Sequence, residues 1–466
     1  MNPKRLILLS YLVTICISTA YSQNTNMPGY DVIATHFFYT YELPVSFPGN
    51  VFEFHKKKDG WYLAEVENNS KQRLKYELLW NKKTNGFNKL SYKISIDTSN
   101  SKANFLENKA STGIGDFELY AFERISYYGY SGWDWDVIQM GKTEQTFSEF
   151  ELESLARAYS NYATGFLYDQ YGYHFENGDT ARKKISTATP ISSYRISKFH
   201  EYIKKSIDYY RLLAEKNPDY QTRVGKVSLK LSGESMFAWS TLKMIGSENK
   251  ATEFIKTGLY NDSILHIAEL LLNDAPQNSI LFTSGDNQTY SLWYMQETKG
   301  LRKDVKVIDI NLLGLNRYIS FLKKHEKIRF SIPDSILHNK TFSVLYKHPN
   351  INSSNSIDID SLTKQIITNV GPISEISSYS MSSDSIRYFT NQKIYFNPLI
   401  PLNSEITTIS EVKLIYLGDY LYGSDLLLID LINMNRADKK ILITFQYELL
   451  SSLLTPEKGL FLFSEN

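Results

Sequence analysis

Residues 279–324 constrain the fold more than any other part of this chain. Two short apolar runs rich in β-branched residues, at 280–283 and 305–310, each precede a stretch with helical periodicity. Strands and helices in this alternation are typical of a parallel sheet joined by crossover helices. The sequence therefore predicts an α/β domain with a mostly parallel sheet at 276–466, interrupted by a polar, irregular insertion at 326–410.

The first part of the chain, residues 23–145, has the pattern of an antiparallel β domain. Short alternating runs at 51–55 and 61–66 flank Asp59-Gly60, a dipeptide typical of hairpin turns. A second pair of runs flanks Asn85-Gly86. We expect a small antiparallel sheet or sandwich here.

Residues 146–275 contain several stretches with helical periodicity, and a long loop at 168–193 separates the first two. One predicted helix, at 199–216, ends before Asn217-Pro218, because the residue before proline disfavours helical geometry. Helix pairs ending this way resemble tetratricopeptide repeats, and the resemblance covers about one repeat at 194–219. The chain is thus expected to be an α+β multi-domain protein with a central tetratricopeptide-like helical layer.

The N-terminus has the features of a signal peptide over residues 1–22. Lys4 and Arg5 precede a short apolar run, and Ala20-Tyr21-Ser22 resembles a cleavage site. The alternative is an uncleaved membrane anchor. Cleavage would leave an exported, periplasmic or cell-surface protein without a transmembrane segment. It would also leave 49 basic and 50 acidic residues, a balance that argues against a general attraction to nucleic acid.

A polar loop follows the first strand of the α/β domain, where open α/β sheets place their ligands. Glycine permits a left-handed turn, Asp and Asn offer hydrogen-bonding groups, and Thr289 could cap the next helix, whose N-terminus could hold an anion. Asp309, near the end of the next strand, could supply a second carboxylate for glycoside hydrolysis. The alternative is a purely structural turn. The ligand-binding candidates are Gly285, Asp286, Asn287, Thr289, Trp293 and Asp309.

An aromatic cluster at 127–136 is a second candidate site. Trp133 and Trp135 could stack on sugar rings, and the carboxylate of Asp134 could bond sugar hydroxyl groups. The alternative is a loop folded back with its aromatic rings buried, because aromatic side chains dominate protein cores.

The α/β region resembles the soluble C-terminal region of a family of multi-spanning membrane glycosyltransferases. These proteins are related to protein O-mannosyltransferases and are common in Bacteroidetes. The matching motifs are Gly285-Asp286-Asn287-Gln288-Thr289, Trp293-Tyr294, Arg302-Lys303-Asp304-Val305, Leu312-Leu313 through Tyr318-Ile319, and residues 420–432. The membrane-spanning catalytic half of that family is not matched. The resemblance therefore implies an accessory domain of an envelope glycosylation-associated system rather than a transferase.

Five Asp-Ser/Thr-aliphatic tripeptides resemble the acceptor pattern of Bacteroidetes periplasmic O-glycosylation. The candidate acceptors are Thr180, Ser263, Ser335, Ser361 and Ser385. Intact-mass analysis of the native protein would test them.

Sequence motifs for catalysis are missing. The chain contains no P-loop, no Gly-x-Ser-x-Gly and no His-Glu-x-x-His, and its one cysteine, Cys16, lies in the signal-like segment. No metal site or cofactor is predicted. The sequence favours a non-catalytic binding or scaffolding protein whose partner is an envelope protein or a glycan. Two alternatives remain: a carbohydrate-active enzyme that uses Asp286 and Asp309, and a component of a secretion or surface assembly.

Overall fold

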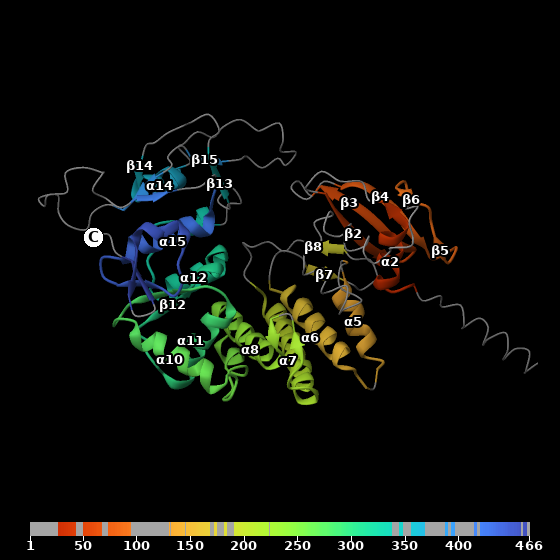
Figure 1. The fold of residues 1–466 in the computed structure, drawn as a ribbon, viewed down its shortest axis with the longest axis horizontal. Coiled ribbons are helices and arrows are strands. Elements are labelled where there is room, and N and C mark those ends of the chain that lie inside the picture. Colours follow the sequence, from red (N-terminus) through yellow and green to blue (C-terminus); the bar gives the residue numbers. More distant parts are fainter. Residues whose placement is uncertain are drawn as a thin grey trace, which may run out of the picture. The chain divides into compact units, whose positions relative to one another are not determined.

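The computed structural model describes most of the chain from residue 27 onward. The described residues are 27–42, 50–67, 73–94, 130, 132–144, 146–167, 172–174, 181–183, 191–222, 224–337, 344–347, 356–368, 387–389, 393–396, 414–416, 420–457 and 460–463. The predicted signal peptide lies outside these residues. Strands and helices are both abundant, and the strands form several separate sheets (Figure 1).

The chain divides into two compact units. The first contains Met1–Ile185 and Glu201–Lys216, and the second contains Ser186–His200 and Asn217–Asn466. The predicted domain boundaries at 145 and 275 stay predictions.

An antiparallel sheet of four strands, β2-β3-β4-β5, forms the first unit's sheet core and confirms the predicted antiparallel N-terminal sheet. Trp61, Leu63, Leu79 and Trp80 from this sheet are buried. The strands of this unit are β1 (Tyr41–Glu42), β2 (Asn50–Lys57), β3 (Gly60–Glu67), β4 (Arg73–Asn81), β5 (Gly86–Phe87), β6 (Lys93–Ile94), β7 (Gly172–His174) and β8 (Ala181–Lys183).

Two helices lie within the segment expected to be β-rich. α2 (Tyr30–Thr40) buries Ile33, Ala34 and Phe37 in the core that also contains Trp61. This spacing of three and four residues places their side chains on one helix face. α5 (Trp133–Gly141) contains the second half of the aromatic cluster, for which a folded-back loop was the alternative to a sugar-binding site. Helix α2 was not expected, because aromatic and β-branched composition favours strands unless tertiary packing overrides it.

The central residues are helical, as the periodicity predicts. α6 (Glu149–Thr164) begins with a capping box, in which Ser148 and Glu151 bond each other's backbone N–H groups. A tetratricopeptide arrangement is not confirmed. The other helices of this stretch are α7 (Ser193–Lys216), α8 (Val227–Met244), α9 (Glu248–Ala251) and α10 (Asp262–Asp274), and the short pair β9 (Gln221–Thr222) and β10 (Gly225–Lys226) precedes α8.

A five-stranded sheet in the order β12-β11-β19-β21-β20 organises the second unit. Strands β12, β11 and β19 pair in parallel, and only β21 runs against the rest, so the sheet is mostly parallel, as predicted. The strands are β11 (Ile280–Thr283), β12 (Lys306–Asp309), β19 (Ile441–Ile443), β20 (Leu454–Glu457) and β21 (Leu460–Phe463).

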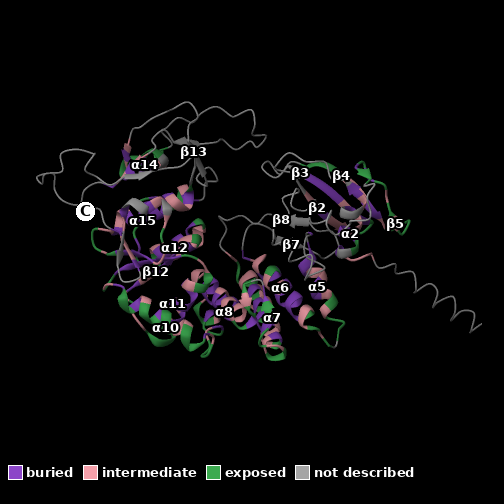
Figure 2. Ribbon diagram, viewed as in Figure 1, coloured by how far each residue is buried: buried purple, intermediate pink, exposed green. Residues whose placement is uncertain are grey.

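Helices cover both faces of this sheet, which is why its central strands read as continuous apolar runs. On one face, Ile280, Phe282 and Ile308 pack with α12 (Asn316–Lys324) and α15 (Gly423–Asn435). On the other face, Leu281 and Val307 pack with α10 and α11 (Asp286–Lys299). α15 is buried along most of its length (Figure 2).

The predicted insertion contains regular structure in its described parts. Strands β13, β14, β15 and β16 of the insertion pair with β17 and β18, which follow it, in two three-stranded sheets of orders β15-β13-β18 and β14-β16-β17. The remaining elements are η1 (Ile310–Gly314), α13 (Asp334–Leu337), β13 (Val344–Lys347), β14 (Ser356–Asp358), α14 (Ile359–Thr368), β15 (Arg387–Phe389), β16 (Lys393–Tyr395), β17 (Leu414–Tyr416), β18 (Tyr420–Tyr422) and η4 (Glu448–Leu453). Each helix in the described part of the chain is too short or too polar to cross a bilayer.

Candidate functional site

Three parallel strands end together at one edge of the second unit's sheet, and each ends in or beside a polar residue. Thr283 closes β11 and Asp309 closes β12, and the two are opposite each other in the parallel register. Thr444 directly follows β19, and its N–H donates to the carbonyl of Phe282 at 3.0 Å. This edge is where α/β sheets bind ligands.

The buried carboxylate of Asp309 organises this edge. Its Oδ2 accepts a hydrogen bond from the Thr289 hydroxyl at 2.8 Å, and its Oδ1 accepts one from the Asn311 N–H at 2.9 Å. The Gly285 N–H donates to the same carboxylate. Burial raises the pKa of Asp309 above its ordinary value, and these three hydrogen bonds oppose that rise.

The turn between β11 and α11 depends on a glycine. Gly285 has φ 83° and ψ 160°, a region that is essentially restricted to glycine. It occupies the N-cap position, and no side chain caps the helix. The expected cap at Thr289 is therefore wrong. Thr289 lies fully buried in the first turn of α11, where its hydroxyl also contacts that of Thr283 at 2.7 Å.

Asp286, the first residue of α11, is exposed at this edge. Partial desolvation by the surrounding protein raises the pKa of its carboxyl, and the charges of Asp309 and Glu234 raise it further. Lys230 and a hydrogen bond from Tyr290 act in the opposite direction. Glu234 is itself buried and paired with Lys230 at 2.7 Å. Asp286 is therefore the carboxylate that a ligand can reach.

The exposed surface around Asp286 is polar. Ser284, Asn287 and Asn311 are also exposed, and the Asn311 amide donates to the Ser284 hydroxyl at 3.3 Å. Together these four side chains offer hydrogen-bond donors and acceptors to a hydroxyl-rich ligand. Across the part of the chain that the structure describes, no three metal-ligating side chains gather in a group that could hold an ion.

Trp293 lies further along α11 and does not join this exposed group. Its indole N–H donates to the carbonyl of Val307 at 3.1 Å. The next turn of α11 supplies Gln296, whose amide donates to the carbonyl of Val305 at 2.7 Å. β12 is an edge strand of the sheet. The side chains of Trp293 and Gln296 therefore bond backbone carbonyl groups on or next to a strand that has a neighbouring strand on one side only.

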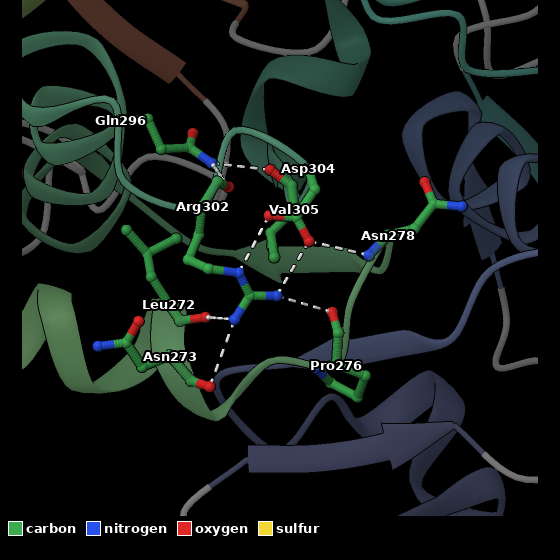
Figure 3. A network of polar contacts seen from close by, with 8 residues as sticks. All are labelled: Leu272, Asn273, Pro276, Asn278, Gln296, Arg302, Asp304 and Val305. Atoms are coloured by element: carbon green, nitrogen blue, oxygen red, sulfur yellow. Dashed lines mark hydrogen bonds and ion pairs between the residues drawn. The ribbon is translucent and has the colours of Figure 1, made fainter.

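The Arg302-Lys303-Asp304-Val305 motif performs a structural role at the opposite end of the strands (Figure 3). The Arg302 guanidinium donates to the carbonyls of Leu272 and Pro276 and forms an ion pair with Asp304. Asp304 in turn accepts from the N–H of Asn278 at 3.0 Å. The ion pair with Arg302 lowers the pKa of Asp304 to about 2. This network ties the end of α10 to the starts of β11 and β12.

The aromatic cluster is largely buried. Trp133 is 7% exposed and Asp134 is fully buried, and both belong to α5 in the first unit. Asp134 accepts from the Trp135 N–H at 2.8 Å and from the Asn161 amide at 3.0 Å. Trp135 is half-buried and packs against the ring of Tyr162. In this conformation Trp133 and Asp134 offer little surface to a sugar.

The candidate O-glycosylation positions divide into two groups. Ser263, Ser335 and Ser361 are exposed, each as the second or third residue of a helix. Thr180 and Ser385 lie outside the described residues. Modification of all five stays a prediction.

Several residues of the strand-end site were not singled out from the sequence. Thr283, Asn311 and Thr444 follow or close apolar runs, and a search for polar residues at the ends of such runs would find them. Lys230 and Glu234 come from α8, which only the tertiary fold brings close, so no local pattern could indicate them.

A comparison with known protein families gives a match over the second unit. Residues 264–454 match the family described as TMEM260-associated domain 2. No curated protein and no solved structure matches the chain. The matched residues contain the strand-end site and the Arg302 network, and they begin in α10 and end at the first residue of β20. This part of the chain is therefore similar to a TMEM260-associated, O-mannosyltransferase-related region.

Proposed function

We propose that this chain is an exported, non-catalytic binding module of the bacterial cell envelope, accessory to a glycan- or glycosylation-associated system. The match to the TMEM260-associated domain 2 supports the glycosylation context. The signal-like N-terminus supports export. Fold and family similarity alone do not assign an activity, which depends on the residues of the site.

The observation that carries the proposal is the burial and hydrogen bonding of the Asp309 carboxylate. Thr289, Asn311 and Gly285 all donate to it, and it is 2% exposed. A carboxylate held in this way positions a loop and does not face a substrate. The loop then presents Asp286 and Asn287 as a preorganised polar surface, which suits binding of glycan hydroxyl groups.

A glycan array tests the proposal with the full chain. Asp286→Asn and Asn287→Ala should each abolish or strongly reduce the wild-type signals of glycans that lack uronic acids. Asp262→Asn is a matched control, because Asp262 is also an exposed acid at the first position of a helix in the same unit. Equal signals from the wild type and Asp286→Asn would remove this surface from the function.

A carbohydrate-active enzyme is the second candidate, favoured by the raised pKa values of both Asp286 and Asp309. A general acid must keep its proton near the working pH, and burial raises the pKa of both groups in the required direction, with a smaller contribution from the charge of Asp309 at Asp286. Mass spectrometry of oligosaccharides incubated with the chain tests this candidate. Cleavage that disappears in Asp286→Asn would establish it, and intact oligosaccharides would exclude it for the sugars used.

A further inference from the structure

A pocket of about 180 Å³ lies on the outer side of the edge strand β12, within the second unit. It is formed by the end of α8, the middle of α11 and by α12. This pocket is distinct from the strand-end surface around Asp286, whose exposed residues do not line it. The residues that matter for its chemistry are Trp239, Trp293, Lys243, Lys303, Glu297 and Glu326.

The pocket has an aromatic wall. The rings of Trp239 and Trp293 lie 6.2 Å apart with an angle of 56° between their planes, and Tyr318 lies 6.4 Å from Trp293. The hydrogen bond from the Trp293 indole to the Val307 carbonyl fixes this ring against the sheet edge. Rigid aromatic side chains supply contact area for a ring-shaped ligand at a low entropic cost.

The rim of the pocket is charged and mixed in sign. Lys243 pairs with Glu297 at 2.9 Å, and Lys306 pairs with Glu326 at 2.7 Å. Lys303 is exposed and has no ion-pair partner among the residues that the structure describes. The rim thus carries three lysines and two glutamates, a net charge of +1. The carboxylates of the rim accept hydrogen bonds from hydroxyl groups, and the additional lysine favours one negative charge.

The volume fits a single ring. An engineered cavity of about 150 Å³ in another protein holds benzene. We propose that the pocket binds one pyranose ring that carries a carboxylate, as in a uronic acid. The ring lies against Trp239 and Trp293, its hydroxyl groups face Glu297 and Glu326, and its carboxylate faces Lys303.

Isothermal titration calorimetry of the full chain with sodium D-glucuronate and with D-glucose tests this assignment. Glucuronate should bind more tightly than glucose. In Lys303→Gln its affinity should fall about fivefold, the effect of losing a largely exposed ion pair. The affinity for glucose should not change in that variant. The side chain of Lys303 supports no described structural contact, and thermal unfolding of the variant confirms that it folds.

Two further variants separate this pocket from the proposed function. Asp286→Asn should bind glucuronate like the wild type, because Asp286 does not line the pocket. Trp293→Leu should lose binding of both sugars, while Trp239→Phe, which keeps an aromatic ring, should retain part of it. Absence of glucuronate binding, equal affinity for glucose and glucuronate, or an unchanged affinity in Lys303→Gln would each overturn the assignment and leave the strand-end proposal standing.

Discussion

The hydroxyl of Thr289 in α11 donates a hydrogen bond of 2.8 Å to the carboxylate of Asp309 at the end of β12. The two residues are separated by 20 positions in the sequence, and both are buried. This contact joins the first turn of the crossover helix to the edge of the sheet. It makes Asp309 a positioning residue and leaves Asp286 as the accessible acid.

Replacing Thr289 with valine should destabilise the protein. The change keeps the side-chain volume but removes a donor from the buried Asp309 carboxylate, and an unsatisfied buried acceptor costs about 1–3 kcal/mol. Urea denaturation measures the loss in the free energy of unfolding. Asn287→Ala is the control, because this exposed residue on the same helix turn should change the value by less than about 0.5 kcal/mol. Equal stability of the two variants would contradict the role of the contact.

Gly285→Ala should lower the free energy of unfolding by about 1–3 kcal/mol, because alanine is strained at φ 83° and ψ 160°. A Cβ atom at this position meets no other atom within 4 Å, so the effect isolates backbone strain from steric overlap. Gly233→Ala in α8 is the matched control. Its Cβ atom also meets nothing within 4 Å, and alanine in a helix is expected to stabilise by about 0.5–1 kcal/mol. Chemical denaturation should thus give effects of opposite sign.

Arg302→Lys should destabilise the second unit although it conserves the charge. Lysine cannot reproduce the planar fork that reaches the carbonyls of Leu272 and Pro276 together with Asp304, and we expect a loss of about 1–3 kcal/mol. Lys303→Ala, at the adjacent exposed position, is the control for a lost positive charge. If thermal or urea unfolding gives the same loss of stability for both variants, the Arg302 network contributes little to the stability of the second unit.

Asp134 predicts a pH dependence of stability in the first unit. Burial raises the pKa of its carboxyl from 3.8 to about 7. The folded chain therefore keeps this proton at pH values where the unfolded chain has released it, and the free energy of unfolding decreases as pH rises through this range. Asp134→Asn removes this contribution. Denaturation at several pH values should show the variant gaining stability relative to wild type from pH 4 to pH 7. A constant difference would contradict the prediction.

The sequence predicted the second unit's sheet well because its central strands are buried on both faces. The apolar runs at 280–283 and 305–310 became β11 and β12, and their polar ends were correctly placed at one edge. The hydrogen bonds between side chains within the strand-end site could not be predicted from the sequence. The contact between Thr289 and Asp309 depends on the strand register and on the start of α11 three residues earlier, and neither is fixed by local pattern.

The first unit was predicted less well. Asp59-Gly60 correctly indicated a hairpin in its sheet, and the structure pairs β2 with β3 across this turn. The aromatic residues of α2 and α5 favour strands by composition, and only packing against the sheet determines that they form helices. The pocket beside β12 was beyond sequence reasoning as well, because α8 and α12 contribute its walls from distant parts of the chain.

The most direct test of the central claim is a glycan array probed with wild-type chain and Asp286→Asn, followed by mass spectrometry of the glycans that remain. For glycans without uronic acids, we predict that the wild type binds, that the variant does not, and that every glycan stays intact. Cleaved glycans under the wild type would contradict a non-catalytic module. Unchanged binding by the variant would contradict the assignment of the surface around Asp286.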